Sequence, residues 1–255
     1  MNDFKFFESL NEFILFRNSS MQNKTIGLVP TMGALHTGHA SLLQRSADEN
    51  DLTVLSLYIN PTQFNNADDL KKYPRSLDAD IDLAKKNGAR IVISPHYEEI
   101  YADKYRFRVS ENNFSKVLCG AHRPGHFDGV LTIVLKLLQL TKATKAYFGE
   151  KDFQQLKLIK DMVASFFIDT EVVACATVRE KDGLALSSRN LRLTEAGRKL
   201  APAIYQAIAH STTIQEAAEK LRQKNIEVEY LEEHYNRRFI AAFIDQVRLI
   251  DNVKI

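Results

Sequence analysis

Pro30-Thr31-Met32-Gly33-Ala34-Leu35-His36-Thr37-Gly38-His39 lies between a short apolar run, 25–29, and a segment, 40–50, whose apolar residues have helical spacing. Glycines in such a loop let the backbone approach a ligand where a Cβ would collide. The first N–H groups of a helix have no intrahelical partner, and with the helix dipole they favour anions. The sequence therefore predicts a strand, a glycine loop and a helix that bind a polyphosphate.

Two histidines of this loop, His36 and His39, stand three residues apart. If the helix begins near Thr37, both imidazoles lie on one side of its N-terminus. Each ring can donate to a phosphate oxygen, and protonation would add positive charge opposite a developing negative one. Two surface histidines beside an ordinary glycine-rich turn give the same pattern, so the loop alone leaves both interpretations open.

The composition is that of an ordinary globular protein. The 255 residues are 45% apolar and 26% charged, and the formal net charge of +2 argues against a protein built chiefly to bind nucleic acid. Cys119 and Cys175 form no CxxC and no disulfide framework, so we expect reduced thiols in the core. Residues 1–17 mix apolar with charged side chains, and no run reaches the length of a membrane-spanning helix. We expect a soluble cytoplasmic protein that binds neither nucleic acid nor membrane.

Strand-like and helix-like segments alternate along most of the chain, after an opening helix. The apolar runs that predict further strands are 52–59, 91–95, 145–148 and 171–178. The helical patterns between them are 77–87, 130–141 and a segment beyond 153. This alternation predicts an α/β fold, with a Rossmann-like parallel sheet flanked by helices. The residues expected to face inward in the helix beyond 153 are Leu156, Ile159, Val163 and Phe166.

The composition changes from Thr194 onward. The segment 194–221 is helix-forming, and the short β-like runs that follow it are 226–230, 241–243 and 246–250. We therefore expect 1–182 to form a Rossmann-like nucleotide-binding domain and 183–255 to form a small C-terminal α+β lid domain.

Polar side chains follow two of the predicted strands. Gln63 comes shortly after one of them, and the strand ends of an open parallel sheet are where ligands bind. Lys151 follows another and offers a point charge for a phosphate or a carboxylate. A solvated loop glutamine, and a helix-capping role for the neighbouring Asp152, would explain the same residues without a ligand.

Two further loops carry cationic or hydroxyl side chains. Arg123 and His126 precede the helix at 130–141, so they border a site, unless His126 serves with Asp128 to cap and brace that helix. Ser187, Ser188 and Arg189 follow the last predicted strand of the sheet, and their donors can bind a triphosphate without deprotonation. A Ser-Ser-Arg sequence alone is too general to identify a site.

The stretch from Met32 to His39 resembles the HIGH-type signature of the nucleotidyltransferase superfamily, in the form found in the pantothenate synthetase (pantoate–β-alanine ligase) family. The resemblance covers nearly the whole chain. FGEKDFQQ at 148–155 matches the family pattern, and Leu186-Ser187-Ser188-Arg189 resembles the KMSKS-like element that pairs with the HIGH-type loop. The departures are Thr62, where the family usually has Met, and a shorter tract between Tyr230 and Ile244.

The resemblance implies an ATP-dependent ligase of pantothenate and coenzyme A biosynthesis. Pantoate would form pantoyl adenylate, and the amine of β-alanine would then displace AMP; Mg²⁺ accompanies ATP, no residue is expected to be a metal ligand, and a homodimer is expected. The family's ATP contacts fall on Met32, Gly33, Ala34, Leu35, His36, Thr37, Gly38, His39, Gly149, Glu150, Lys151, Asp152, Val178, Leu186, Ser187, Ser188 and Arg189. Its pantoate and β-alanine contacts fall on Gln63 and Gln155. The expected catalytic groups are His36, His39, Lys151, Ser187, Ser188 and Arg189.

Three alternatives remain open at this point: another adenylyltransferase of the superfamily, a class I tRNA synthetase fragment, and a nucleotide-binding protein without catalysis. An adenylyltransferase would keep the adenylate as product, whereas a ligase releases AMP. A synthetase needs an anticodon domain or a basic RNA surface, and the sequence shows neither. An inactive protein predicts a damaged motif, yet His36, His39, Lys151 and Arg189 are all present. The absence of a P-loop motif disfavours γ-phosphoryl transfer.

Overall fold

The computed structural model describes residues 4–65, 67–71 and 73–255, and packing divides them into two compact units. The first contains the described residues up to Gly149 together with Gln154–Cys175. The second contains Glu150–Phe153 and Ala176–Ile255. This packing boundary falls ahead of residue 182. The division into a domain 1–182 and a domain 183–255 stays a proposal.

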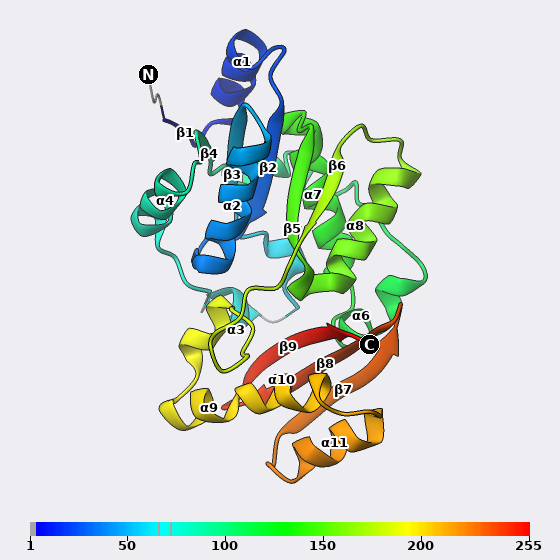
Figure 1. Cartoon of the computed structure of the whole chain (residues 1–255). Helices are drawn as coiled ribbons and strands as arrows, with labels where there is room; N and C mark the ends of the chain where they lie inside the picture. The colour runs from blue at the N-terminus through cyan, green and yellow to red at the C-terminus, as the bar shows by residue number, and fades with distance from the viewer. Residues whose placement is uncertain (1–3, 66, 72) are drawn as a thin grey trace. The chain divides into compact units, whose positions relative to one another are not determined.

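A six-stranded parallel sheet forms the centre of the first unit, in the order β1-β4-β3-β2-β5-β6 (Figure 1). Its strands are β1 (Lys5–Phe7), β2 (Ile26–Thr31), β3 (Leu52–Leu57), β4 (Ile91–Ile93), β5 (Lys145–Gly149) and β6 (Glu171–Cys175). The predicted α/β fold with a parallel sheet is confirmed. The strand β1 is an addition, because three residues are too few to show a strand pattern in the sequence.

Helical segments connect successive strands, as parallel pairing requires. They are α1 (Leu10–Ser20), α2 (Thr37–Glu49), η1 (Pro61–Gln63), α3 (Ala67–Lys71), α4 (Leu77–Lys86), α5 (Tyr97–Ile100), η2 (Phe114–Lys116), α6 (Cys119–His122), α7 (His126–Thr141) and α8 (Phe153–Ser165). Figure 1 shows α2 in front of the sheet and α7 behind it. Within the described ranges, no helix is both long and apolar enough to cross a membrane.

The sheet is buried on both faces. On the α2 face, Leu42 and Leu43 pack in one cluster with Val29 and Leu55 of the strands. The helix α7 is buried almost all round, with Leu131 only 1% exposed, as its nearly continuous apolar sequence predicts. The thiols of both cysteines are also buried, as expected.

The helix α8 confirms three of the four inward positions expected for it. Leu156, Ile159 and Val163 are buried, but Phe166 is 55% exposed and that prediction was wrong. The reason is local, because α8 ends at Ser165 and Phe166 lies in the turn beyond it.

The strand order reverses beside the histidine loop. From β2 the sheet continues through β3 to β4 on one side, and through β5 to β6 on the other. In open parallel sheets, ligands bind beyond the carboxyl ends of the strands at such a reversal. Because Thr31 ends β2 directly before the loop, the sheet carries this loop to the edge where ligands bind.

The second unit contains an antiparallel sheet of three strands in the order β7-β8-β9. Its elements are η3 (Glu150–Asp152), η4 (Ser188–Arg192), α9 (Glu195–Leu200), α10 (Pro202–Ala209), α11 (Ile214–Arg222), β7 (Glu227–His234), β8 (Arg237–Ile244) and β9 (Val247–Lys254). Ile204 of α10 and Leu221 of α11 share an apolar cluster with Ile240 of β8. The predicted small α+β part is therefore confirmed, with one face of the sheet covered by helices.

The strands of this sheet are longer than the apolar runs predicted. Tyr235 and Asn236 link β7 to β8, and Asp245 and Gln246 link β8 to β9, all with φ between 50° and 63°. Two consecutive residues with positive φ form a type I′ turn, whose twist matches that of the strands. None of the four is glycine, so the usual Asn-Gly signal for such a hairpin was missing from the sequence.

Candidate active site

The helix α2 begins directly after the histidine loop, and His36 is its N-cap residue. The Gly38 N–H donates to His36 Nδ1 at 3.1 Å, and the His36 N–H donates to His39 Nδ1 at 3.2 Å. The centroids of the two imidazoles are 4.1 Å apart. The expectation that the helix begins near Thr37, with both rings on one side, is confirmed.

These hydrogen bonds fix which nitrogen of each ring carries a proton. Because His36 Nδ1 and His39 Nδ1 both accept backbone N–H groups, the proton of each neutral imidazole resides on Nε2. A phosphate oxygen accepts such a donor. Each ring can therefore donate to a polyphosphate through Nε2, without giving up the bond that orients it.

Several backbone N–H groups expected to bind the anion are used inside the protein. Those of Ala34 and Leu35 donate to the carboxylate of Asp80 at 2.8 and 2.7 Å. That of His39 donates to the His36 carbonyl at 2.8 Å. We conclude that the loop offers side chains, rather than these main-chain groups, to a phosphate. The contacts with ATP predicted for Ala34 and Leu35 would have to involve other atoms.

Gln63 ends η1, and its amide is held on both sides. Asn60 Nδ2 donates to Gln63 Oε1 at 3.2 Å, and Gln63 Nε2 lies 3.0 Å from Met32 Sδ. Gln63 and Met32 follow neighbouring strands, β3 and β2. The structure thus brings a predicted pantoate contact against a predicted ATP contact.

The orientation of Asn60 is itself fixed by hydroxyl groups. Its Oδ1 accepts from Tyr101 at 2.9 Å and from Thr62 at 3.0 Å, and the residue is only 1% exposed. Burial raises the pKa of Tyr101 to about 12, so its hydroxyl stays a neutral donor at physiological pH. Thr62, which stands where the family usually has Met, therefore adds a hydroxyl that helps to orient Asn60 and, through Asn60, Gln63.

Arg123 and His126 contact the backbone of Gln63. His126 Nδ1 lies 2.8 Å from the Gln63 carbonyl oxygen, and Arg123 Nη2 donates to the same oxygen at 3.2 Å. Since that oxygen can only accept, His126 Nδ1 carries a proton, and the neutral ring presents Nε2 as an acceptor to Arg123 Nη1 at 3.2 Å. Arg123 and His126 therefore support the Gln63 loop, and no side chain caps the N-terminus of α7, where His126 is the first helical residue. That the pair borders a site stays a prediction.

Adjacent glutamines at the start of α8 have different environments. Gln154 is buried, and its amide is fully engaged with the backbone of Cys119, Phe114 and Val117. Gln155 is half-buried, and no described residue forms a hydrogen bond with its amide. Gln154 is thus structural, whereas Gln155 is available for the pantoate contact predicted for it.

Lys151 lies in η3, which packs within the second unit. Asn252 Nδ2 donates to the carbonyls of Glu150 and Lys151 at 3.0 and 2.9 Å. The guanidinium of Arg237 lies 4.4 Å above the ring of Phe153 and 3.4 Å from the Glu150 carboxylate. These contacts fasten the segment Glu150–Phe153 to strands β8 and β9.

The ammonium of Lys151 is only loosely paired. Its Nζ lies 3.9 Å from a carboxylate oxygen of Asp152, whose side chain is 46% exposed. An ion pair of this length and exposure neutralises little charge. Lys151 therefore keeps positive charge for a phosphate.

The Ser187–Arg189 loop has a defined turn. Ser187 is the N-cap of η4, and its Oγ accepts from the Arg189 N–H at 3.3 Å. Ser188 is buried, and Asn190 Nδ2 donates to the Ala185 carbonyl at 3.0 Å.

Arg179 supports the turn that leads into this loop. It donates to both carboxylate oxygens of Asp251, at 2.6 and 2.9 Å, and to the Gly183 carbonyl at 3.0 Å. Beside it, the Leu186 N–H donates to the Val178 carbonyl at 3.0 Å. Two predicted ATP contacts, Val178 and Leu186, are thereby adjacent.

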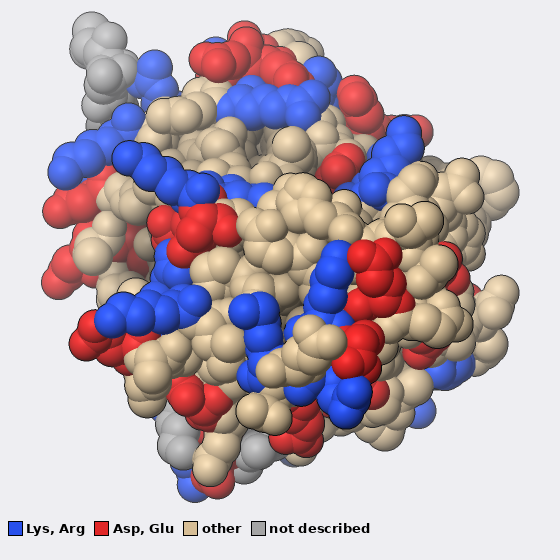
Figure 2. Space-filling view, turned by 60° about the horizontal axis from the view of Figure 1, so that its bottom comes forward, with Lys and Arg blue, Asp and Glu red and all other residues tan. Residues whose placement is uncertain are grey.

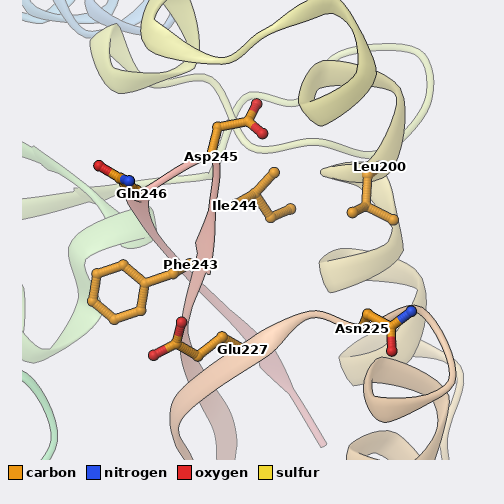
Figure 3. Close-up of a pocket in the computed structure, with 7 residues that line it drawn as sticks. All are labelled: Leu200, Asn225, Glu227, Phe243, Ile244, Asp245 and Gln246. Atoms are coloured by element: carbon orange, nitrogen blue, oxygen red, sulfur yellow. The ribbon is translucent and has the colours of Figure 1, made fainter.

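A hollow of about 430 Å³ lies at the β8–β9 turn of the second unit. Ile244 points toward Leu200, while Phe243 points the other way (Figure 3). The lining residues are Leu200, Asn225, Glu227, Phe243, Ile244, Asp245 and Gln246, and no predicted site residue is among them. The carboxylates of Glu227 and Asp245 in this lining would repel the phosphates of a nucleoside triphosphate, so the hollow is unsuited to one.

On the face seen in Figure 2, basic and acidic side chains are interspersed. Over the part of the chain that the structure describes, no three His, Cys, Asp or Glu side chains gather closely enough to hold a metal ion. A divalent cation at this site would need ligands from the substrate.

The residues that hold the site in place were missed by sequence reasoning. They are Asp80, Asn60, Arg179, Asp251 and Asn252. Except for Asn60, which acts on the nearby Gln63, each has a partner distant in sequence, as Asp80 has in Ala34 and Leu35, and no periodicity or short motif reports such a pairing. Only the buried polar position of Asp80, Asn60, Asp251 and Asn252 distinguishes them, and burial becomes visible only in the folded chain.

Comparison with known proteins gives one consistent result. The family model for pantoate-beta-alanine ligase matches residues 5–254. A pantothenate synthetase of Bdellovibrio bacteriovorus is 55% identical over 97% of this chain and 98% of its own length. A pantothenate synthetase of Coxiella burnetii is 46% identical over 98% and 96%.

Solved structures are similar over the same extent. The pantoate-beta-alanine ligase of Francisella tularensis, solved with beta-gamma ATP and beta-alanine, has a TM-score of 0.93 and 40% identity. The alignment covers 98% of this chain and 97% of that one. The pantothenate synthetase of Thermus thermophilus has a TM-score of 0.90 and 35% identity, over 98% and 99% of the two chains.

Proposed function

This chain belongs to the pantoate–β-alanine ligase family, and from that membership we propose that it condenses pantoate with β-alanine to pantothenate while ATP becomes AMP and pyrophosphate. The observation that carries the proposal is the match over residues 5–254, which includes every motif on which the chemistry depends. We assign the ATP, pantoate and β-alanine contacts to the residues at the matching positions.

In the first step, a carboxylate oxygen of pantoate attacks the α-phosphorus of ATP, and the bond to the bridging oxygen of pyrophosphate breaks. Negative charge gathers on the phosphoryl oxygens and on the leaving group. His36 and His39 would donate to these oxygens through Nε2, with ring orientations already fixed at Nδ1. Donors held in place before the reaction stabilise the transition state without reorganising.

The remaining cationic and hydroxyl groups would act on the same charge. We assign Lys151, Ser187, Ser188 and Arg189 to the phosphates, since each offers a donor that needs no deprotonation. The loose pairing of Lys151 supports this assignment. The backbone at Val178 and Leu186 would contact the adenosine end of ATP.

In the second step, the amine of β-alanine attacks the acyl carbon of pantoyl adenylate. The bond from that carbon to the AMP oxygen breaks, and the nitrogen loses a proton as the amide forms. Gln63 and Gln155 would orient pantoate, because a neutral amide can both donate to a carboxylate and accept from a hydroxyl. The fixed amide of Gln63 and the available amide of Gln155 support this assignment.

Magnesium would enter with the nucleotide. The described residues offer no cluster of metal ligands, and Mg²⁺ commonly binds through substrate phosphates and water. We propose that MgATP is the substrate, with the ion neutralising phosphate charge. No residue of this chain is assigned to it.

Assembly and location are also proposals. We propose a homodimer from family membership; light scattering that gave a monomer mass would contradict it. The cytoplasmic location expected from composition remains a prediction, and fractionation of cells would test it.

The decisive experiment follows an isotope through the reaction. Purified protein is incubated with MgATP and pantoate labelled with ¹⁸O in its carboxylate, with and without β-alanine. We expect pantothenate and AMP to accumulate only with β-alanine, and ¹⁸O to appear in the AMP phosphate, because the carboxylate oxygen stays on phosphorus. Label in inorganic phosphate, a dinucleotide product or no AMP would contradict the proposal.

A further inference from the structure

Asp80 is a buried carboxylate to which the proposed reaction gives no role. It lies near the start of α4 and is only 4% exposed. Its Oδ2 accepts from the Ala34 N–H at 2.8 Å, and its Oδ1 accepts from the Leu35 N–H at 2.7 Å and from the Ser76 hydroxyl at 3.2 Å. A buried charge is tolerated only when it is hydrogen-bonded in this way. Both oxygens of Asp80 are thus committed to a loop far away in sequence.

The backbone that Asp80 holds is of an unfavourable kind. Gly33 has a φ of 81° and Ala34 a φ of 52°, so two consecutive residues are left-handed, which is costly for the one with a Cβ. Successive N–H groups in such a turn converge and form an anion-binding concavity. A Cβ on Gly33 would stand 3.0 Å from Asp80 Oδ2, so the carboxylate already fills the concavity.

The imidazoles follow directly from this turn. His36 is the residue after Leu35; its N–H holds His39 Nδ1, and its own Nδ1 is held by the Gly38 N–H. Asp80 therefore holds the backbone one residue before His36, and the hydrogen bonds of His36 in turn orient both rings. If the Leu35 amide moved, the backbone of His36 would move with it. The Nε2 atoms of both imidazoles would then change position.

We propose that Asp80 is the positioning residue of the histidine pair: an internal carboxylate, rather than the nucleotide, sets the loop and so directs both Nε2 atoms. The inference rests on the proposed function only for what those atoms bind. An amide cannot replace the carboxylate, because it offers one acceptor oxygen and turns donor hydrogens toward the second loop N–H.

The test compares Asp80→Asn with Asp82→Asn, an exposed carboxylate of the same helix. Two quantities are measured on the whole chain: the imidazole ¹⁵N spectrum, which reports the protonated nitrogen of each ring, and the kcat and KM for each substrate. We expect Asp80→Asn to shift the His36 and His39 signals and to lower kcat about 100-fold, while KM for pantoate changes less than about threefold. Asp82→Asn should change neither.

A second variant keeps the test decisive if Asp80→Asn does not fold. Ser76→Ala removes only the hydroxyl that braces Asp80 Oδ1, and we expect about a three- to tenfold loss of kcat together with a smaller shift of the same signals. A folded Asp80→Asn, or Ser76→Ala, with unchanged kcat and an unchanged spectrum overturns the proposal. Absence of AMP formation by the wild type would instead overturn the proposed function, and the spectra would still decide the role of Asp80.

Discussion

A single side chain, His36, caps a helix and is also assigned to the proposed site, and the two roles can be separated by substitution. Its Nδ1 accepts the Gly38 N–H, which is the bond that an N-cap oxygen normally provides. Its Nε2 is the atom we assign to phosphate. Asparagine can reproduce the first function but not the second.

We therefore expect His36→Asn and His36→Ala to be equally inactive but unequally stable. Loss of the Nε2 donor should lower kcat by a factor on the order of 10²–10³ in both. Loss of the cap should make the alanine variant less stable than the asparagine variant by about 1 kcal/mol. Steady-state kinetics and urea unfolding measure the two effects; equal stability of the two variants would contradict the capping role.

The predictability of the site differs from residue to residue. His36, His39, Lys151 and Gln63 could be predicted as site residues because short motifs carry them, and their roles stay predictions from the resemblance. Asp80 could not, because its partners lie 45 and 46 residues earlier and nothing in the sequence of α4 marks its contact with that loop. The distinction between Gln154 and Gln155 likewise depends on burial in the folded chain.

At the scale of elements, the last turn of α2 is joined to β5 by a polar cluster. Glu49 accepts from Arg45 at 2.8 Å, from Lys145 at 3.1 Å and from the Tyr147 hydroxyl at 2.9 Å. These hydrogen bonds, that of Arg45 above all, lower the pKa of the Glu49 carboxyl from 4.5 to about 2. A depressed pKa gives stability that is present above the unfolded value and is lost as the pH falls through the folded value.

We expect Glu49→Gln to unfold at a lower temperature than the wild type at about pH 7. The difference should shrink as the pH falls from 4.5 toward 2, where the wild-type carboxyl becomes protonated. Thermal unfolding followed by circular dichroism over this range tests it. Glu195→Gln is the control, because Glu195 and Lys199 form an exposed ion pair that contributes little to stability. A difference in unfolding temperature that did not change with pH would contradict the expected link between the Glu49 pKa and stability.

In the hairpin between β8 and β9, a substitution should raise the stability of the protein rather than lower it. Gln246 has a φ of 63°, which is costly for any residue with a Cβ. We expect Gln246→Gly to stabilise the protein by up to about 1 kcal/mol, since relief of this strain exceeds the entropy that glycine adds to the unfolded chain. Urea unfolding should show a higher midpoint for Gln246→Gly and a lower one for Gln246→Val; the reverse order would rule out strain at this turn.

At the scale of the whole molecule, a bound nucleotide should stabilise the fold. A non-hydrolysable ATP analogue at 100 times its Kd adds about 2.7 kcal/mol. For a chain of this size, that corresponds to a rise in Tm of about 5–10 °C. Differential scanning fluorimetry measures it, with the matching GTP analogue as control. No shift at saturating concentration would count against nucleotide binding.

The same analogue tests the Ser187–Asn190 loop. If ATP orders this loop, trypsin should cleave after Arg189 more slowly with the analogue, while cleavage after the exposed Lys224 stays unchanged. Mass spectrometry of a digestion time course distinguishes the two sites. Equal cleavage after Arg189 with and without nucleotide would contradict ordering.

The architecture could be predicted because alternating strands and helices leave few arrangements. Two features of the architecture could not be predicted in this way. Strand β1 is too short to show a pattern, and Glu150–Phe153 follow β5 without a break yet pack with residues of β8 and β9. Packing between segments distant in sequence decides such assignments.

That packing of Glu150–Phe153 has a consequence for building hybrids of related enzymes. The second unit consists of two separate stretches of chain, one of only four residues. A crossover placed after Cys175 would join the Asn252 and Arg237 of one parent to the Glu150 and Phe153 of the other. A hybrid that inherits both stretches from the same parent keeps these partners matched, so recombination at this fold needs three junctions rather than one.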